Sequence, residues 1–127
     1  MVARQTFTSG QTLTAAQMNG VAEANLAVNA QGTATAYTLA LTDAGKLITF
    51  EGAAATVTIP TNASVALAVG DQINIAQLGT AAVTVGTASG VTLQSQGGKT
   101  KTNGQFAVVT CVQHTANSWI LLGNTSA

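Results

Sequence analysis

Charged and aromatic side chains are scarce in this sequence. Of its 127 residues, 6% are Asp, Glu, Lys or Arg and 4% are Phe, Trp or Tyr, whereas 46% are hydrophobic. Catalytic acids, bases and electrostatic clamps are drawn mostly from charged residues and histidine. His114 is the one histidine of the chain. The composition therefore predicts a protein that is not an enzyme and that uses no cofactor.

The few charges are also balanced and scattered along the chain. Four Lys or Arg residues offset four Asp or Glu residues, so that the formal net charge is zero. A protein that binds nucleic acid needs a basic patch or stripe that releases counterions from the phosphate backbone. Because the sequence has no such cluster, we expect no nucleic-acid partner.

Long apolar runs and paired cysteines are missing as well. No run approaches the roughly 20 apolar residues of a membrane span, and the N-terminus lacks the basic-then-apolar pattern of a signal peptide. Cys111 is the single cysteine, so no disulfide can form within the chain. We expect a protein that is made in a cytoplasm, does not insert into a membrane, and is stabilised by packing and strand pairing.

Residues 1–30 differ in pattern from the rest of the chain. Met1–Thr12 has little periodicity and is typical of an extended arm, whereas Thr14-Ala15-Ala16-Gln17 matches a helix capping box. The sequence predicts a short helix from Ala15 to about Asn29, with a narrow stripe formed by Gln17, Val21, Ala24 and Val28. Because an isolated helix of this length is marginal in water, we expect it to dock on another surface.

From residue 31 onward the apolar residues alternate with polar ones, as in half-buried strands. The alternating sets are Tyr37, Leu39 and Leu41; Val57 and Ile59; Ile73 and Ile75; Val83 and Val85; and Val91 and Leu93. Turn residues separate these sets at intervals of about 8–12 residues, which favours a sandwich or barrel. We predict a mainly β protein: a compact antiparallel β-sandwich or barrel-like domain over residues 31–127, preceded by the N-terminal arm and one short α-helix.

Two segments near the C-terminus are apolar on both faces of an extended strand. They are Phe106–Val112 and Trp119–Leu122, and Asn117 between them predicts a hairpin. Strands of this kind are covered on both sides. The cover is either the interior of the chain or another subunit, and a monomer this small has little material to cover both faces. We therefore expect an oligomer.

Cys111 and His114 are the only pair that could form a nucleophile and its base. Side chains on a strand alternate with a period of two, so a separation of three places the pair on opposite faces. A buried thiol and a histidine near the end of the strand are the expected roles.

Two other patterns resemble chemical motifs without completing them. Gly97-Gly98-Lys99-Thr100 matches the end of a phosphate-binding loop, but Leu93 stands where the first glycine belongs, and a turn and strand follow in place of a helix. Asp43, Glu51 and Asp71 supply carboxylates of the kind that a glycosidase pairs across a sugar. Each lies beside a turn glycine, where a carboxylate caps backbone amides. We expect a glycine turn, capping acids and no metal site.

Several segments resemble a β-rich module of tailed-bacteriophage virion proteins. The segments are Tyr37–Ile48, Val57-Thr58-Ile59-Pro60, Val69–Gly79 and Trp119–Gly123, and Phe7–Asn19 is similar to a segment near the start of such proteins. Together they cover most of the chain. In that group the module occurs in tail fibres, head fibres and capsid decoration proteins, and the resemblance implies a homotrimer.

The resemblance implies a non-enzymatic structural protein of the virion. Because the arm and helix lead almost directly into the β domain, we expect a capsid decoration or cement protein that contacts the major capsid protein or other virion subunits and stabilises the lattice. The alternative is a tail-fibre or head-fibre component that binds a host receptor or surface glycan. The expected attachment or subunit contacts are Phe7, Leu13, Met18, Val21, Val28, Val108, Val112, Trp119 and Leu121.

Overall fold

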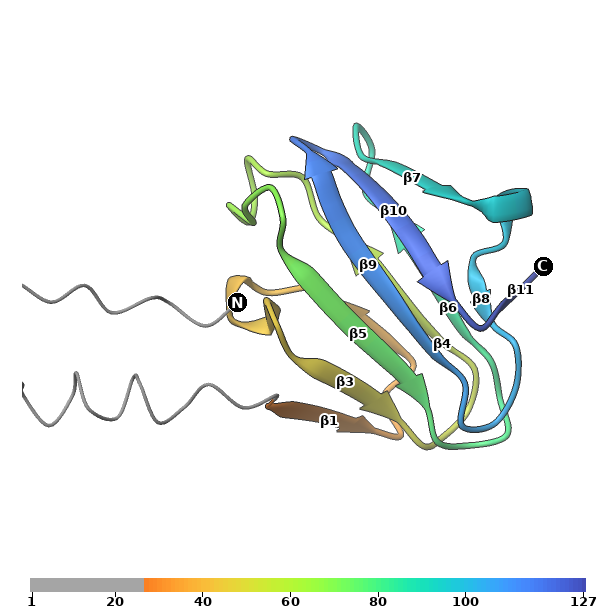
Figure 1. Ribbon diagram of the computed structural model, residues 1–127. Coiled ribbons are helices and arrows are strands. Elements are labelled where there is room, and N and C mark those ends of the chain that lie inside the picture. The colour runs from red at the N-terminus through yellow and green to blue at the C-terminus, as the bar shows by residue number, and fades with distance from the viewer. Residues whose placement is uncertain (1–26) are drawn as a thin grey trace, which may run out of the picture.

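From β1 to β9, strands that follow one another in sequence alternate between two sheets, as the computed structural model of the chain shows (Figure 1). The structure describes residues 27–127. Sheet A has the order β1 (Val28–Gly32), β3 (Leu47–Phe50), β5 (Gln72–Gln77), β9 (Val108–Thr115), β10 (Ser118–Gly123), β7 (Thr92–Ser95). Sheet B has the order β11 (Thr125–Ser126), β8 (Lys101–Thr102), β6 (Val83–Thr87), β4 (Ala55–Ile59), β2 (Ala36–Thr38). Short 3-10 turns occupy Leu41–Asp43 and Gln96–Gly98.

The prediction of a mainly β protein is confirmed, but the prediction that the strands are antiparallel is wrong for much of the fold. Of the nine strand pairings in residues 27–127, five are parallel, including β1 with β3 and β3 with β5. From β1 to β6 each strand crosses to the opposite sheet before the chain returns. In all four of these pairings the returning strand lies parallel to its neighbour, whereas β8, which returns by way of β7, pairs antiparallel with β6. Apolar alternation reports which side chains face inward and carries no information on strand direction.

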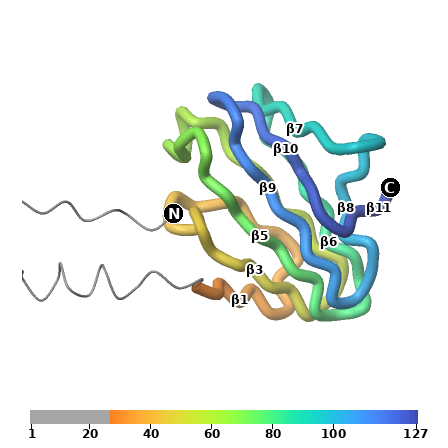
Figure 2. Tube along the Cα trace, viewed as in Figure 1, coloured from red at the N-terminus to blue at the C-terminus, as the bar shows by residue number. Residues whose placement is uncertain are grey.

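The C-terminal part of the fold contains the predicted hairpin. β9 and β10 pair antiparallel, and Asn117 lies in the turn between them with a left-handed φ of 57°. The Asn117 side chain also accepts a hydrogen bond from the Asn62 N–H at 2.7 Å, which ties the turn to the loop after β4. In Figure 2 the described chain starts at β1 on one side of the molecule and ends beyond β11 on the other.

The structure also places the start of the β domain earlier than expected. β1 begins at Val28, so Val28 and Asn29 lie in a strand and not in a helix that continues to Asn29. The rest of the expected arm and helix lies outside the described residues. The β domain accordingly includes residues 28–30, which the sequence had assigned to the preceding segment.

The core lies between the two sheets and follows the predicted alternation. Sheet A contributes Ile48, Phe50, Ile73, Ile75, Val109, Cys111, Trp119 and Leu121, and sheet B contributes Ala55, Val57, Ile59, Val83 and Val85. Burying one side chain of this size contributes about 1.5–3 kcal/mol relative to exposure. Packing of one face of each sheet therefore holds the layers together and leaves the other face of each sheet outside.

A buried polar contact also joins the two sheets. The Thr102 hydroxyl of β8 donates to Gln77 Oε1 of β5 at 2.5 Å and accepts from the Val83 N–H at 2.9 Å. The Gln77 amide donates in turn to the Gly79 carbonyl at 3.0 Å. Buried polar groups are tolerated when they are paired in this way. The contact fixes the connection from β5 to β6 relative to sheet B.

Candidate functional site

The outer face of sheet A is the most apolar exposed surface that the strands build. Alternation and register place the following side chains there: Val28, Leu47, Gln72, Asn74, Thr92, Gln94, Val108, Thr110, Val112, His114, Ile120 and Leu122. None of these residues is Asp, Glu, Lys or Arg. Val108, Ile120 and Leu122 keep 44%, 41% and 50% of their surface exposed. Ile120 pairs with Val112 across β10 and β9, so the apolar side chains are neighbours on the face.

The outer face of sheet B has a different character. Thr56 of β4 pairs with Thr84 of β6, and Thr58 lies two residues further along the same face. Thr38 of β2 pairs with Thr58. Threonine hydroxyls can bond to water while their methyl groups cover the backbone, so this face suits contact with solvent. The two sheets thus share an apolar interior but present chemically distinct outer faces.

Phe106 is a second exposed apolar group, and its backbone is unusual. The side chain is 71% exposed, and the residue has a left-handed φ of 69°. A non-glycine residue with this φ costs on the order of 1–3 kcal/mol and persists only where the surroundings impose it. Phe106 lies two residues before Val108, where β9 begins.

Hydrogen bonds from the preceding turn impose the conformation of Phe106. The Phe106 N–H donates to the Gln77 carbonyl at 2.6 Å, and the Gln105 side chain donates to the Leu78 carbonyl at 3.0 Å. Gln77 is itself held by Thr102, as described above. The phenyl ring therefore projects from a fixed backbone, and ordering it at an interface costs little conformational entropy.

The structure distributes the predicted contact residues among three places. Phe7, Leu13, Met18 and Val21 lie outside the described residues. Val28, Val108 and Val112 lie on the outer face of sheet A, with Val28 61% exposed at its edge. Trp119 and Leu121 face the core between the sheets and are covered within the chain itself. Chain packing therefore accounts for the apolar character of these last two residues.

The two-faced apolar strands are covered on one face only within this chain. Val109 and Cys111 of β9 and Trp119 and Leu121 of β10 point inward, whereas their alternating neighbours point outward. Sequence reasoning left interior and intersubunit cover open for these strands. The outward side chains of β9 and β10 therefore either face solvent or contact something other than residues 27–127 of the same chain.

Cys111 and His114 do not form a catalytic pair in this fold. Cys111 is buried in the core, and burial raises the pKa of its thiol to about 12. His114 is exposed on the other face of β9, where its Nε2 lies 3.1 Å from the Ser118 hydroxyl. The thiol is therefore neutral and inaccessible, and the histidine has no access to it.

Asp43 and Asp71 cap equivalent turns. Asp43 Oδ2 accepts from the Ala40 N–H and Asp71 Oδ2 from the Ala68 N–H, each at 2.8 Å. The N–H of each aspartate donates to the carbonyl of the same alanine, each at 3.0 Å. Both aspartates are buried, whereas Glu51 is exposed. The expected capping role is thus confirmed for Asp43 and Asp71.

Asp43 also organises a polar cluster beside β1. The Tyr37 hydroxyl donates to Asp43 Oδ2 at 2.5 Å, and Asn29 Nδ2 donates to Asp43 Oδ1 at 2.9 Å. Burial, and then the hydrogen bond and charge of Asp43, raise the pKa of Tyr37. This cluster anchors β1 and the turn at Leu41–Asp43, and every polar atom in it serves the fold.

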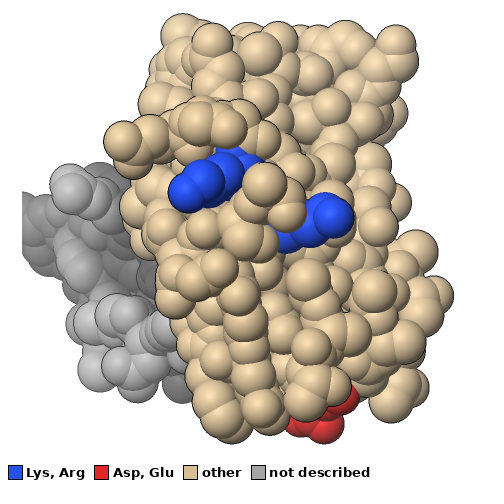
Figure 3. Space-filling view, turned by 90° about the vertical axis from the view of Figure 1, so that its right-hand side faces the viewer, with Lys and Arg blue, Asp and Glu red and all other residues tan. Residues whose placement is uncertain are grey.

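The lysines Lys99 and Lys101 lie on the side of the molecule where the Gln96–Gly98 turn and β8 meet β11 (Figure 1). Figure 3 faces this side and shows two groups of basic atoms, with acidic atoms at the lower edge of the view. A pocket of about 430 Å³ here is lined by Gln96, Gly97, Lys99, Gly123, Asn124 and Thr125. Gly97 and Gly98 have positive φ and a strand follows, so the predicted glycine turn is confirmed.

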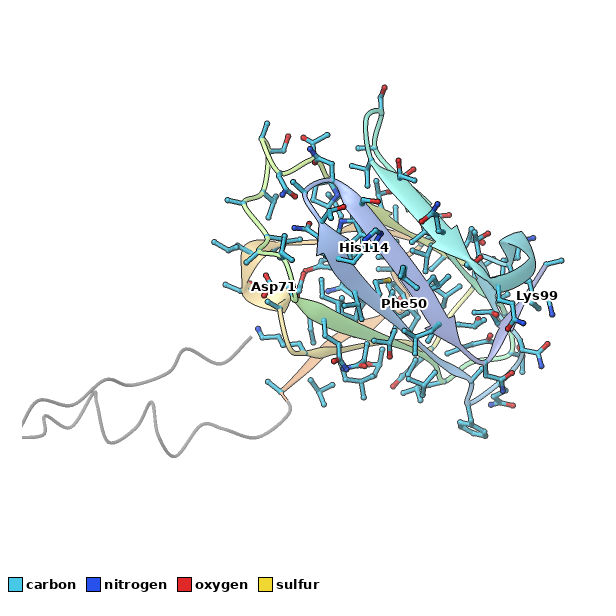
Figure 4. All side chains as sticks on the ribbon, turned by 45° about the horizontal axis from the view of Figure 1, so that its top comes forward. Phe50, Asp71, Lys99 and His114 are labelled. Atoms are coloured by element: carbon cyan, nitrogen blue, oxygen red, sulfur yellow. The ribbon has the colours of Figure 1, made fainter. Side chains whose placement is uncertain are left out.

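The candidate catalytic residues do not converge on one place. Figure 4 shows Asp71, His114 and Lys99 on separate parts of the fold, with Phe50 between the sheets. No group of three or more His, Cys, Asp or Glu residues in the described part of the chain could hold a metal ion. Within residues 27–127, no helix is long and apolar enough to cross a membrane.

Sequence reasoning missed Phe106, Ile120 and Leu122 as candidate contact residues. The apolar segments containing them were recognised, but the choice of face depended on the register of β9 with β10. For Phe106 the signal was its position after Asn103-Gly104, since a turn often ends with a residue in the left-handed region. Compared with known proteins, the chain matches no protein-family model and no curated protein.

Proposed function

We propose that this protein is a non-enzymatic structural protein of the tailed-bacteriophage virion. In this role it is a homotrimeric decoration subunit that binds the outside of the head and stabilises the capsid lattice. The observation that carries the proposal is the apolar outer face of sheet A, which has no Asp, Glu, Lys or Arg among its outward strand positions. Such a face packs against neighbouring subunits without desolvating charges.

The segments that resemble phage virion proteins serve as scaffold in this fold. Tyr37–Ile48 includes most of β2, the Asp43 turn and the first half of β3, and Val69–Gly79 includes the Asp71 turn and β5. Their polar residues cap turns, and their apolar residues fill the core. In these segments the residues serve turn formation and core packing, which is consistent with a structural subunit.

The mechanism of stabilisation is binding to the assembled lattice. A decoration subunit that binds the assembled shell, and does not bind the separate capsid subunits, stabilises the shell. The stabilisation grows with the logarithm of the ratio between the concentration of the decoration subunit and its dissociation constant. Linked contacts from several copies raise the overall affinity without new chemistry. No reaction is required of any side chain.

The pocket beside Lys99 favours a second candidate function. Its polar groups are the amides of Gln96 and Asn124, the Thr125 hydroxyl and the Lys99 ammonium, which suit the hydroxyl and acidic groups of a surface glycan. No aromatic side chain lines it, although stacking on a sugar ring is a common source of affinity. A fibre component that binds a host glycan is therefore the second candidate.

Copy number and particle binding distinguish the two candidates. A decoration subunit is present in hundreds of copies per particle, and purified protein added to undecorated heads binds them to saturation and raises their resistance to heat. A fibre component is present in a handful of copies, binds glycans or host cells in isolation, and loses that binding in Lys99→Ala.

A deletion of residues 1–26 tests where the attachment device lies. Residues 27–127 contain a hydrophobic core between the two sheets, so we expect the remaining domain to fold. If residues 1–26 attach the protein, the truncated domain no longer associates with particles. Retained association would assign the binding surface to the strands.

A further inference from the structure

We propose that Asn103-Gly104, in the connection between β8 and β9, is a covalent modification site at which Asn103 deamidates spontaneously to a mixture of aspartyl and isoaspartyl forms. The inference goes beyond the proposed function and does not rest on it. Its basis is the geometry of this connection, which leaves both reacting groups free in the folded chain.

The Asn103 side chain and the Gly104 nitrogen are the two groups that react. Asn103 is exposed, and within residues 27–127 neither its side-chain amide nor the Gly104 N–H forms a hydrogen bond. The Asn74 and Asn117 side chains, by contrast, accept hydrogen bonds at 2.8 Å and 2.7 Å. The fold therefore holds these two amides in place and leaves the Asn103 amide free to turn.

Gly104 leaves the attacking nitrogen unhindered. Because glycine has no Cβ, its backbone turns readily toward the side chain of the preceding residue. A Cβ placed at Gly104 would meet nothing within 4 Å, and this glycine is not one of those with a positive φ. Gly104→Ala is therefore compatible with the fold, and it hinders the reaction without straining the turn.

The reaction needs only water and hydroxide. Hydroxide removes the Gly104 N–H proton, and the nitrogen attacks Asn103 Cγ to close a five-membered succinimide. The side-chain nitrogen takes a proton from water and leaves as ammonia. Water then adds to one of the two succinimide carbonyls and breaks its C–N bond. One product is an aspartyl residue, and the other is an isoaspartyl residue whose main chain runs through the side-chain methylene.

The isoaspartyl product disturbs two hydrogen bonds of the fold. The Asn103 N–H donates to the Asn124 carbonyl at 3.0 Å, next to the pairing of β8 with β11, and the Gly104 carbonyl accepts from the Ala107 N–H at 3.1 Å. The isoaspartyl linkage adds one backbone atom between these two bonds. We therefore expect it to loosen β11, whereas the aspartyl product changes only the charge.

Peptide mapping of the full chain by mass spectrometry, after incubation in mildly alkaline buffer, tests the inference. Deamidation adds about 1 Da to the peptide that contains Asn103, because ammonia is lost and water is gained. Electron-transfer fragmentation distinguishes the aspartyl from the isoaspartyl product. A parallel sample in guanidinium chloride gives the rate in the unfolded chain. The matched control is Gly104→Ala, and Asn117, which precedes Ser118, is the internal reference.

We expect Asn103 to convert in the folded chain nearly as fast as in the unfolded chain, and well ahead of Asn117. In Gly104→Ala the rate falls by at least about tenfold, which corresponds to about 1.4 kcal/mol of activation free energy. Conversion of Asn103 in the unfolded sample alone overturns the inference, as does an unchanged rate in Gly104→Ala. If Gly104→Ala does not fold, the comparison between folded and unfolded wild type decides the outcome.

Thermal unfolding of the separated products tests the structural consequence. Asn103→Asp carries the new charge without the additional backbone atom, so it is the matched control for the isoaspartyl form. We expect the isoaspartyl form to unfold at a lower temperature than Asn103→Asp. Equal unfolding temperatures would contradict the loosening of β11.

Discussion

Asp43 shows how a scarce charge is used in this molecule. Its carboxylate accepts hydrogen bonds from the Ala40 N–H, the Tyr37 hydroxyl and the Asn29 amide, and it is buried. Hydrogen bonds to a charged acceptor contribute about 1.5–3 kcal/mol each when the group would otherwise be desolvated. One aspartate therefore fixes a turn, a strand edge and a tyrosine, and none of these contacts leaves it free for chemistry.

The raised pKa of Tyr37 predicts how stability responds to high pH. The folded state holds the tyrosine proton more tightly than the unfolded state, in which the pKa is about 10. This contribution to stability is complete below pH 10 and is lost as the pH rises from there through the folded pKa. We expect the free energy of unfolding, measured with urea, to fall more steeply above pH 10 for the wild type than for Tyr37→Phe.

Other effects of high pH are common to both proteins, so the difference between their slopes isolates Tyr37. Equal slopes would mean that the hydroxyl titrates alike in the folded and unfolded chains. At neutral pH, Tyr37→Phe is less stable by about 1.5–3 kcal/mol, because Asp43 loses one donor.

The Cys111 thiol is predicted to be inert in the folded protein. It is buried in the core, and burial raises its pKa to about 12, so almost none of it is thiolate near neutral pH. We expect a disulfide reagent at pH 8 to label Cys111 only as fast as the chain opens, and immediately in denaturant. Rapid labelling of the folded protein would contradict its placement in the core.

At the scale of the element, β10 ends where only glycine fits. Gly123 has a φ of 116°, and a Cβ placed there would lie 2.6 Å from the Val108 carbonyl oxygen. That carbonyl accepts a hydrogen bond from the Asn124 N–H, so it cannot move away without loss. The close approach is what allows β10 to turn into β11 beside β9.

We predict that Gly123→Ala destabilises the fold by more than Gly98→Ala. Both glycines have positive φ, but a Cβ at Gly98 meets nothing within 4 Å. Gly98→Ala therefore carries only the backbone penalty, about 1–2 kcal/mol. Gly123→Ala adds a clash with backbone to that penalty. Thermal unfolding of the two variants measures the difference, and equal losses would show that β10 moves to accept the methyl group.

For the whole molecule, neutrality predicts how assembly responds to salt. Contacts between apolar surfaces are not screened by ions, whereas contacts between charged surfaces weaken as the Debye length falls. We expect the self-association constant to change less than about twofold from about 0.05 M to about 0.5 M sodium chloride. Sulfate, which strengthens apolar burial, should raise it. A steep fall with sodium chloride would instead implicate the lysine side of the molecule.

Several features of the fold and the site followed from particular residues. The alternation of Val57 with Ile59 and of Ile73 with Ile75 predicted strands with one buried face, and the structure buries all four residues. Asn117 predicted the hairpin that joins β9 to β10. These features are local, because side chains alternate along any strand and turn residues act on their own backbone.

Strand direction, sheet order and the choice of face were decided only by tertiary structure. The chain crosses between the sheets after each strand from β1 to β6, and the neighbouring strands of this part are parallel, a direction that alternation does not predict. Trp119 and Ile120 are equally apolar in sequence, but the pairing of β10 with β9 puts the first in the core and leaves the second outside. Phe106 acquires its left-handed backbone from Gln77. The sequence by itself determined a neutral, mainly β protein with few groups for chemistry, because composition and alternation are properties of the chain alone. Which apolar residues remain for a partner depends on what each sheet packs against, and that is a property of the folded chain.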